Sequence, residues 1–343
     1  MNLDIEEHAS LKTMNTMRLD SVARYFGRVE SLAALQDALL FANKLHLPII
    51  PLGEGSNVVL GEFLEALVLL IRLKGREITE RRHGTALIRA GAGEHWHSLV
   101  CWSLEQGLYG LEKLALIPGY VGAAPIQNLG AYGVELKDCF VNLEAVDRQT
   151  GEMITLSAED CAFGYRDSVF KNHLIDRLII TSVTLRLDET VVPELNCDAL
   201  RKKAADFAGK GKELTGMDIC RAVCAIRREK LPDPELMGNV GSFFKNPIVS
   251  NEHKIMLQNR FSDMPVYRVA GGWKLAAAWL IDQCGFKGCL KRKGGAGVYE
   301  KQALVIVNHG DACRKDILIL AEEIRVAVEE RFAVALEVEP RIY

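Results

Sequence analysis

No two cysteines of this sequence stand at the Cys-x-x-Cys spacing, although nine cysteines are present. Cys220 and Cys224 lie four residues apart on an expected helix, and Cys284 and Cys289 flank a glycine turn, but neither pair has further metal ligands nearby in the sequence. An odd number of cysteines at irregular spacing is typical of reduced thiols in the cytoplasm and argues against a disulfide framework or a zinc site. We therefore expect a cytoplasmic protein that holds no metal.

The sequence also lacks an excess of one charge and a long apolar run. Its formal net charge is −3, so no overall charge attracts nucleic acid or an anionic membrane. The longest apolar run, at 66–71, has the length of a strand and is too short to span a membrane. Residues 1–10 contain three carboxylates and no apolar core, so we expect no signal peptide.

The remaining composition is that of a globular protein with more than one domain. A chain of 343 residues with 49% hydrophobic and 25% charged residues exceeds the usual size of one core, and two or three domains are expected. Residues 191–214 are polar and rich in alanine and lysine, which indicates a crossing between domains. Apolar patterns predict strands at 49–52, 66–71, 87–90, 141–146, 179–187, 303–308 and 335–338. They predict helices from an N-cap at Ser31, between 93 and 107, and at 217–230, 274–282 and 311–332.

Residues 117–133 (IPGYVGAAPIQNLGAYG) contain four glycines, two prolines and no charged side chain. The prolines exclude a helix, and the glycines argue against a plain central strand. Bare backbone lets main-chain N–H groups approach an anionic or planar ligand. Gln127, Asn128 and Tyr132 add neutral hydrogen-bonding groups. A tight packing corner is the alternative, but the length of the stretch favours a cradle for a cofactor.

Residues 53–58 (GEGSNV) begin like a dinucleotide-binding fingerprint, but Val58 stands where the third glycine is required. A strand at 66–71 follows instead of a helix, so the Rossmann context fails. Two strands joined by a tight glycine turn can still bind a diphosphate through backbone N–H groups. A plain β-turn is the alternative interpretation.

Residues 238–247 (GNVGSFFKNP) present Ser242 on a glycine turn. The pattern is not Gly-x-Ser-x-Gly and has no suggestive Asp and His partners, so a hydrolase triad is disfavoured. A serine without a base is a poor nucleophile, although it can protonate a strongly basic carbanion.

Arg166, in residues 163–168 (FGYRDS), is either a structural ion-pair residue or a bidentate clamp for a carboxylate. His95 and His97 are two residues apart on an expected helix and do not share a face, so we interpret them as structural or surface residues and not as a metal pair. The basic loop at 285–297 is either a solvated cluster or a phosphate-facing loop.

Together these motifs resemble the UDP-N-acetylenolpyruvoylglucosamine reductase family, whose members are also called UDP-N-acetylmuramate dehydrogenases. The matching motifs occur in the same order over nearly the whole chain. The chain looks like the form of the family that has the larger substrate domain. The matching segments are 52–57 (LGEGSN), 116–119 (LIPG), 125–128 (PIQN), 130–133 (GAYG), 164–168 (GYRDS), 230–232 (KLP), 241–247 (GSFFKNP) and 336–341 (LEVEPR).

The resemblance implies an α+β protein, with a two-subdomain FAD-binding region of the vanillyl-alcohol-oxidase type followed by an α/β substrate-binding domain. The implied domains are 1–70, completed by 331–343, then 71–215, then 216–330. The implied activity is that of a bacterial cytoplasmic flavoenzyme of peptidoglycan precursor synthesis. Non-covalent FAD would take a hydride from NADPH and pass it to the enolpyruvyl methylene of a UDP-sugar. No nucleic acid, membrane or obligate protein partner is implied.

The family motifs also assign roles to individual residues. Ser242 would protonate the carbon that bears the carboxylate, and Arg166 and Glu339 would stabilise the enol-like intermediate. The implied FAD contacts are Leu52, Gly53, Glu54, Gly55, Ser56, Asn57, Ile117, Pro118, Gly119, Gly122, Ala123, Gln127, Asn128, Gly130, Ala131 and Tyr132. The implied substrate contacts are Tyr132, Arg227, Lys230, Asn246 and Gln302.

Two departures from the family pattern affect this assignment. Asn196 stands at the best-matched position for a tyrosine that closes over the nucleotide sugar in this form of the family. Ala123 and Ala124 offer no hydroxyl where relatives can have serine, so any phosphate contact there must come from backbone N–H groups.

Two other functions stay open from the sequence. One is a flavin oxidase or dehydrogenase with the same cofactor fold, in which His95 or His97 would attach FAD covalently. The other is a non-catalytic protein that binds a flavin or a nucleotide sugar.

Overall fold

The computed structural model describes residues 3–190, 195, 197–209, 211–290 and 295–343. Contacts within the chain divide it into two compact units. Unit 1 consists of Met1–Ala9, Ala23–Glu54 and Glu65–Glu229, and unit 2 of Ser10–Val22, Gly55–Leu64 and Lys230–Tyr343. The three domain ranges expected from the family stay a prediction.

The first sheet has the strand order β1 (Ile5–Ser10), β2 (Val22–Val29), β5 (Phe63–Ile71) and β3 (Ile49–Leu52). β3 and β5 are parallel. Helix α1 (Leu32–Leu45) begins at Ser31, whose hydroxyl accepts a hydrogen bond from Ala34 N–H at 3.1 Å, as its N-cap position predicts. It ends at Leu45 and is followed by His46, a C-cap residue with a left-handed backbone.

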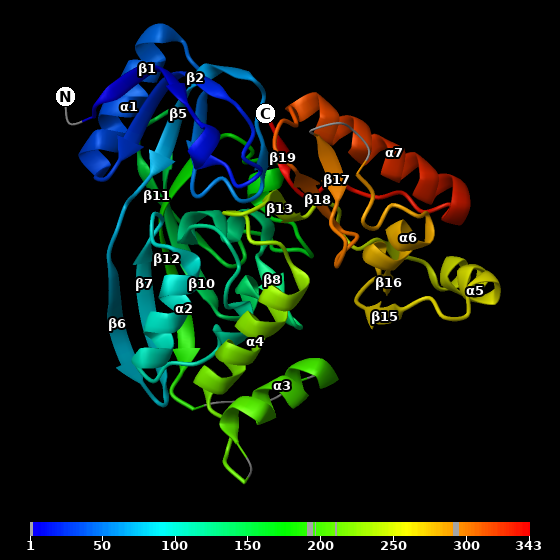
Figure 1. Ribbon diagram of the computed structural model, residues 1–343. Helices are drawn as coiled ribbons and strands as arrows, with labels where there is room; N and C mark the ends of the chain where they lie inside the picture. The colour runs from blue at the N-terminus through cyan, green and yellow to red at the C-terminus, as the bar shows by residue number, and fades with distance from the viewer. Residues whose placement is uncertain (1–2, 191–194, 196, 210, 291–294) are drawn as a thin grey trace. The chain divides into compact units, whose positions relative to one another are not determined.

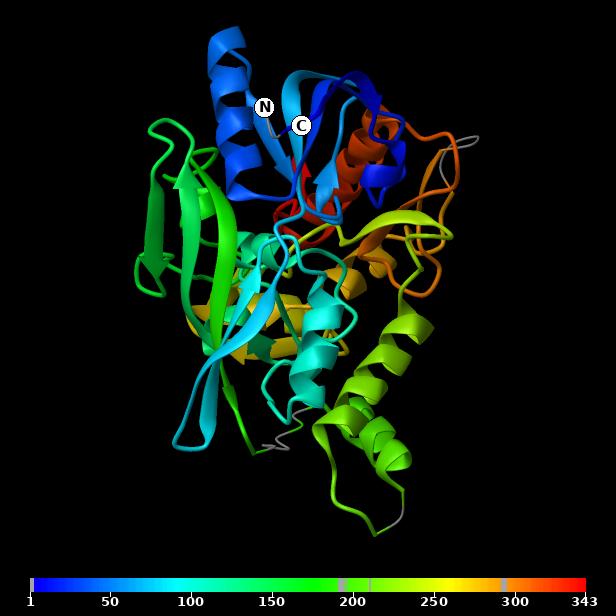
Figure 2. The same ribbon diagram turned by 90° about the vertical axis from the view of Figure 1, so that its left-hand side faces the viewer.

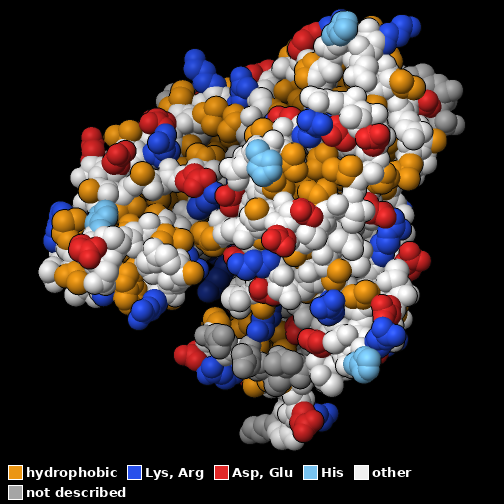
Figure 3. Space-filling model, turned by 180° about the vertical axis from the view of Figure 1, so that it is seen from behind, with side chains coloured by type: hydrophobic (Ala, Val, Ile, Leu, Met, Phe, Trp, Pro, Cys, Tyr) orange, Lys and Arg blue, Asp and Glu red, His pale blue; other side chains and the backbone are white. Residues whose placement is uncertain are grey.

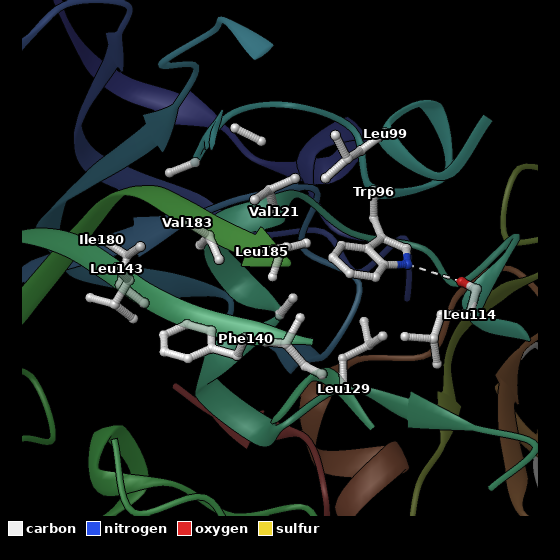
Figure 4. Packing of buried hydrophobic residues seen from close by; sticks show 14 of the residues in the cluster. Trp96, Leu99, Leu114, Val121, Leu129, Phe140, Leu143, Ile180, Val183 and Leu185 are labelled. Carbon is white, nitrogen blue, oxygen red and sulfur yellow. Dashed lines mark hydrogen bonds between the residues drawn. The ribbon is translucent and has the colours of Figure 1, made fainter. Parts of the chain in front are cut away.

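The second sheet is antiparallel, with the order β11 (Met153–Ser157), β10 (Phe140–Asp147), β12 (Leu178–Asp188), β7 (Thr85–Gly91) and β6 (Arg76–Arg82) (Figures 1 and 2). Helix α2 (Trp96–Glu105) packs on it. Figure 4 shows Leu99 of α2 and Val121 near Val183 and Leu185 of β12, all of them buried. This core fixes α2 relative to the sheet.

Short 3-10 turns and small strands replace longer helices and strands between α2 and β10. The turns are Glu112–Leu114, Val121–Ala123, Pro125–Gln127 and Leu136–Asp138, and the strands are β8 (Gly130–Ala131) and β9 (Val134–Glu135). Two further 3-10 turns are Lys12–Met14 and Val169–Lys171. The glycine-rich stretch therefore has irregular backbone, as its prolines and glycines predict.

Two helices follow the second sheet. Residues 191–214, expected to be a crossing between domains, contain helix α3 (Asp198–Ala208) and belong to unit 1. Helix α4 (Gly216–Lys230) confirms the helix predicted there. The Nζ atom of Lys203 lies 2.6 Å from Oε1 of Glu229, which joins the two helices.

Unit 2 contains two three-stranded sheets. One has the order β13 (Gly238–Ser242), β18 (Val305–Asn308) and β17 (Ala296–Val298), and the other β14 (Ile248–Val249), β16 (Gly272–Leu275) and β15 (Val266–Val269). Its helices are α5 (Asn251–Arg260), α6 (Ala277–Gln283) and α7 (Arg314–Phe332). α7 buries Ile317, Leu320, Ile324 and Val328, so the predicted amphipathic helix is confirmed.

Two predicted elements of unit 2 are wrong in extent. The helix predicted at 274–282 begins only at Ala277, because Gly272–Leu275 pairs with β15. The strand predicted at 335–338 is reduced to one antiparallel bridge between Val338 and Phe244. The last strand is instead β19 (Arg341–Ile342), which is parallel to β4 (Val58–Val59).

The face drawn in Figure 3 has Lys and Arg side chains interspersed with Asp and Glu, as the small net charge predicts. Over the described residues, no helix combines the length and the apolar character that crossing a membrane requires.

Candidate active site

The glycine-rich stretch of unit 1 is a segment of left-handed backbone turns. Positive φ angles occur at Leu116 (56°), Gly119 (130°), Asn128 (45°), Tyr132 (51°) and Gly133 (82°). Residues with side chains seldom adopt this region, and they persist there only where their surroundings hold them. Such turns direct successive N–H groups away from regular pairing, which suits a cradle for an anionic ligand.

The start of α2 holds this stretch in place. The Trp96 indole Nε1–H donates to the Leu114 carbonyl at 2.9 Å (Figure 4), and the Trp96 N–H donates to the Gly119 carbonyl at 3.0 Å. The Val121 N–H donates to the Glu94 carbonyl at 2.9 Å. Trp96 is fully buried, so the cradle rests on the core of the second sheet.

Gly122 allows this close approach to the sheet. Its N–H donates to the Ala92 carbonyl at 2.9 Å, and a Cβ at Gly122 would lie 2.6 Å from the Ala92 Cβ. No side chain fits in that space without moving the backbone. The residue expected to contact FAD therefore also has a packing reason to be glycine.

The second glycine loop meets the cradle through Glu54. Its carboxylate accepts the Gly119 N–H and lies 3.4 Å from Nε2 of His95. Burial raises the pKa of the Glu54 carboxyl, but the hydrogen bond and charge of His95 and the Gly119 N–H outweigh it and hold this pKa below its ordinary value. A Cβ at Gly53 would lie 3.3 Å from the Tyr120 Cβ, so this loop is also closely packed.

The rest of that loop belongs to unit 2. Gly55 has φ +67°, and a Cβ there would lie 2.2 Å from the Met14 carbonyl oxygen. The Thr16 N–H donates to the Gly55 carbonyl at 3.1 Å, and the Arg341 N–H donates to the Asn57 carbonyl at 3.0 Å. The glycine is therefore required by the local backbone.

Asn128 is fully buried, and its side chain bonds to the protein itself. Its amide N–H₂ donates to Glu135 Oε2 at 3.0 Å and to the Gly164 carbonyl at 2.9 Å, while its Oδ1 accepts the Lys137 N–H at 3.0 Å. Its side chain therefore joins the glycine-rich stretch to residues 135–137 and to Gly164. Of the other expected FAD contacts, Leu52 is buried, while Ile117, Gly122, Gln127, Ala131 and Tyr132 are partly exposed and Pro118 and Ala123 are exposed.

Two arginines lie near each other beside this cradle. Arg166 has φ +52°, and its Nη2 donates to the Gly130 carbonyl at 2.5 Å. Arg227 of α4 donates from Nε to the Leu116 carbonyl at 3.1 Å. Burial lowers the pKa of the Arg227 guanidinium, and the charge of Arg166 lowers it further, whereas Tyr132 offsets part of the change. Two neighbouring guanidinium groups beside a tyrosine favour an anion with several oxygens.

Burial also raises the pKa of the Tyr132 phenol, although the Arg227 charge opposes this. The phenol therefore stays neutral at physiological pH and acts as a hydrogen-bonding group beside the two cations.

In unit 2, Ser242 lies exposed at the end of β13. Gly241 before it has φ +70°, and its N–H donates to Oδ1 of the buried Asn239 at 3.0 Å. The pairing of β13 with β18 shifts register between Asn239 and Ser242, and such an irregularity changes the direction of the strand and of its side chains. The Glu339 N–H donates to the carbonyl of Phe243 at 3.0 Å, so Ser242 and Glu339 lie on adjoining segments.

The expected substrate contacts of unit 2 have mixed surroundings. Asn246 accepts the Ala277 N–H at 2.9 Å through Oδ1 and so caps α6, and Gln302 Oε1 accepts the Leu304 N–H at 3.4 Å. Lys230 is exposed at the end of α4. Asn196 and residues 291–294 of the basic loop lie outside the described residues, while Lys287 pairs with Asp282 at 3.3 Å.

Two family models match the chain. The model described as "FAD binding domain" matches residues 23–157, and the model described as "UDP-N-acetylenolpyruvoylglucosamine reductase, C-terminal domain" matches residues 233–343. The chain is 46% identical over 344 residues to the UDP-N-acetylenolpyruvoylglucosamine reductase of Pseudomonas aeruginosa, with 100% of both chains covered. It is 48% identical over 342 residues to that of Cupriavidus pinatubonensis, with 98% of both covered.

The chain belongs to the UDP-N-acetylenolpyruvoylglucosamine reductase family. The solved structure of the reductase of this name from Thermus caldophilus is similar over 100% of this chain and 99% of that one, with a TM-score of 0.67 and 25% identity. The fold class expected from the resemblance is confirmed: an FAD-binding region of the vanillyl-alcohol-oxidase type and a separate C-terminal domain.

The residues present fit the FAD that this family fold implies. Gly53, Gly55 and Gly122 are held by close packing against Tyr120, Met14 and Ala92, whereas Gly133, at φ +82°, has open space where a Cβ would stand. The left-handed turns from Leu116 to Gly133 supply further irregular backbone. Glycines that leave backbone bare are the usual means of holding a dinucleotide diphosphate closely.

Proposed function

We propose that this chain is an FAD-dependent oxidoreductase that uses NADPH to reduce the enolpyruvyl group of UDP-N-acetylglucosamine enolpyruvate, giving UDP-N-acetylmuramate for peptidoglycan synthesis. The observation that carries the proposal is the match over the full length of the chain, at 46% identity, to a relative named for this reductase. The FAD binding domain match supports the cofactor. We place the reaction in the cytoplasm and expect it to need no protein partner.

FAD, when bound, carries the reducing equivalents of NADPH to the enolpyruvyl group. On this proposal the backbone of 53–57 and 117–133 holds the cofactor. Arg166 binds the carboxylate of the substrate as negative charge spreads into it, because a fixed guanidinium stabilises that charge without reorganisation. Arg227 and Tyr132, which lie beside Arg166 in unit 1, contact the nucleotide sugar.

Ser242 is proposed to donate its hydroxyl proton to the carbon that bears the carboxylate. Its exposed position after Gly241 supports this role, because an exposed hydroxyl can reach a bound substrate. A hydroxyl is a weak acid, but the enol-like intermediate is a strong base. Glu339, on the segment adjoining Phe243, is proposed to stabilise that intermediate. Lys230, Asn246 and Gln302 complete the proposed substrate contacts.

The direct test uses the purified protein alone. We expect a bound flavin spectrum, and NADPH oxidation that starts only when the enolpyruvyl UDP-sugar is added, with UDP-N-acetylmuramate identified by mass spectrometry. NADPH oxidation without the sugar nucleotide, accompanied by peroxide, would indicate an oxidase. Flavin binding with no turnover would indicate a binding protein.

Ser242→Ala separates the two half-reactions. Reduction of the flavin by NADPH should be nearly unchanged, whereas reoxidation by the substrate should slow by about 100- to 10,000-fold, the usual contribution of a general acid. Stopped-flow absorbance of the flavin measures both. Equal losses in the two half-reactions would remove Ser242 from the role of acid.

A further inference from the structure

Helices α2 and α4 bring together a histidine and three thiols that the proposed reaction does not use. His97 and Cys101 come from α2, and Cys220 and Cys224 from α4. Cys101 Sγ lies 3.7 Å from Nε2 and 3.9 Å from Nδ1 of His97, and Cys224 lies near enough to His97 and Cys220 for its thiol to be influenced by both. Among the described residues, no cluster of three or more His, Cys, Asp or Glu side chains could hold a metal ion, and this cluster is no exception.

His97 has a definite hydrogen-bonding role in this cluster. Its Nδ1 accepts the backbone N–H of Leu116 at 3.1 Å. A nitrogen that accepts a hydrogen bond carries no proton, so the proton of the neutral imidazole is on Nε2. His97 therefore connects the thiol cluster to the beginning of the cofactor cradle.

The backbone of Leu116 is held on both sides of its Cα. Its N–H is bound by His97, and its carbonyl accepts Nε–H of Arg227 at 3.1 Å. Leu116 has φ +56°, a conformation that costs roughly 1–2 kcal/mol for a residue with a side chain. These two hydrogen bonds, together with the packing of its side chain against the core, hold the strained residue in position.

Arg227 depends on that carbonyl for its own position. The neighbouring Arg166 carries the same charge, so the two guanidinium groups repel each other and each needs an acceptor to hold it in place against that repulsion. Arg166 is held by the Gly130 carbonyl and Arg227 by the Leu116 carbonyl. If Leu116 relaxed from its left-handed conformation, Arg227 would lose this acceptor.

We infer that His97 is a positioning residue: through the backbone N–H and carbonyl of Leu116, it fixes Arg227 at the place where a nucleotide-sugar anion binds. The inference rests on the proposed function, because it takes Arg227 as a substrate contact. It predicts an effect of His97 on substrate affinity that is transmitted only by Arg227.

Two substitutions at His97 separate its acceptor from its bulk. His97→Phe keeps a ring of similar volume but removes the acceptor, whereas His97→Asn places Oδ1 near the position of Nδ1 and keeps it. We expect His97→Phe to raise KM for the UDP-sugar about 10- to 100-fold, as removal of a supporting hydrogen bond often does, with little change in flavin reduction by NADPH. His97→Asn should restore KM to within a few-fold of the wild type. Equal KM values in the two variants would overturn the inference.

A double-mutant cycle with Arg227→Met tests whether the effect of His97 on substrate affinity is transmitted through Arg227. If His97 acts through Arg227, His97→Phe should add almost nothing to the KM of Arg227→Met, since coupled residues are not additive. Full additivity would show that His97 acts elsewhere. Ser98→Ala, an exposed position of the same helix, is the matched control and should leave KM unchanged.

A readout without turnover distinguishes this inference from the proposed function. In the substrate-free protein, heteronuclear NMR should show His97 as the tautomer with its proton on Nε2, and the Arg227 Nε–H signal should shift in His97→Phe but not in His97→Asn. If Arg227→Met leaves KM unchanged while these signals behave as expected, the proposed substrate contact fails and the positioning of Arg227 stands. An unshifted Arg227 signal in a folded His97→Phe variant would contradict the positioning itself.

Discussion

Four residues with side chains, Leu116, Asn128, Tyr132 and Arg166, have left-handed backbones in the candidate site. Each such conformation costs roughly 1–2 kcal/mol. The cost is tolerated where specific hydrogen bonds fix the residue, as the three bonds of the Asn128 side chain do. Conformational strain of this kind is concentrated at functional sites, where it directs side chains that regular structure would direct elsewhere.

Arg166→Lys should lower kcat/KM by at least about 100-fold. A lysine keeps the positive charge but lacks the planar fork that binds a carboxylate through two hydrogen bonds, and it loses the fixed donor to the Gly130 carbonyl. Steady-state kinetics with the UDP-sugar measures the change. Arg177→Lys, at an ion pair with Asp147 of 2.7 Å, is the control and should retain activity. If Arg166→Lys turned over substrate at the wild-type rate, Arg166 would have a structural role and no role in binding the carboxylate.

Glu54→Gln should lower the melting temperature by about 1–3 °C near pH 7, a modest effect because the pair with His95 is partly exposed. The folded protein holds the pKa of Glu54 below its ordinary value, so the unfolded chain binds more protons and this stabilisation is lost as the pH falls through the folded pKa. Thermal melts of both proteins from pH 7 down to about pH 3 should therefore converge below the ordinary pKa of a glutamate. A difference that grows towards acid would contradict this assignment.

At the scale of elements, α2 supports the cradle. Its first turn uses a side chain and a backbone N–H of Trp96, together with the His97 ring, to hold Leu114, Leu116 and Gly119. The helix was predicted from its apolar pattern. Its supporting role was not, because the partners lie 18 or more residues further along the chain and only packing on the second sheet brings them together.

Trp96→Phe tests this support. The ring remains, but the buried Leu114 carbonyl loses its donor, which should cost about 1–3 kcal/mol. Urea unfolding followed by circular dichroism measures the loss, and FAD affinity should fall with it. Trp102→Phe in the same helix is the control, because Trp102 is only half-buried and stacks on Arg76. Equal stability of the two variants would show that the indole hydrogen bond contributes little.

Helices and strands with one clearly apolar face were predicted more accurately than those without one. Strand β12 and helix α7 each have a clear apolar face and were predicted within a few residues. Strand β6 (REITERR) was missed, because as an exposed edge strand it has charges on both faces. The helix at α6 was predicted too early, because Trp273 and Leu275 of the preceding strand also fit a helical period.

At the scale of the whole chain, two matched families divide the sequence between a cofactor region and a C-terminal domain. The chain segments do not follow this division strictly. Residues 10–22 and 55–64 belong to unit 2 together with the C-terminal part. Ser242 and Glu339 therefore belong to unit 2, while Arg166, Tyr132 and Arg227 belong to unit 1.

FAD should be released when the protein is precipitated with acid. The proposed function uses non-covalent FAD, and two of the four ring nitrogens of the candidate histidines are already engaged, Nδ1 of His97 with Leu116 and Nε2 of His95 with Glu54. Flavin absorbance of the supernatant and the pellet decides the matter. Flavin retained in the pellet would favour the oxidase alternative and point to His95, whose Nδ1 has no partner in the described part of the chain.

The sequence by itself determined the family, the cofactor and the reaction, because long motifs such as 116–119, 164–168 and 241–247 are specific and occur in order. It also determined the helices and strands that have one buried face. Only the tertiary structure decided which motif residues bond to the protein itself, as Asn128 and Asn246 do, and which lie exposed, as Ser242 does. Only it showed that His97, Leu116 and Arg227 form a chain of hydrogen bonds. The physical reason is that hydrogen bonds between distant segments depend on packing, which no local pattern of residues encodes.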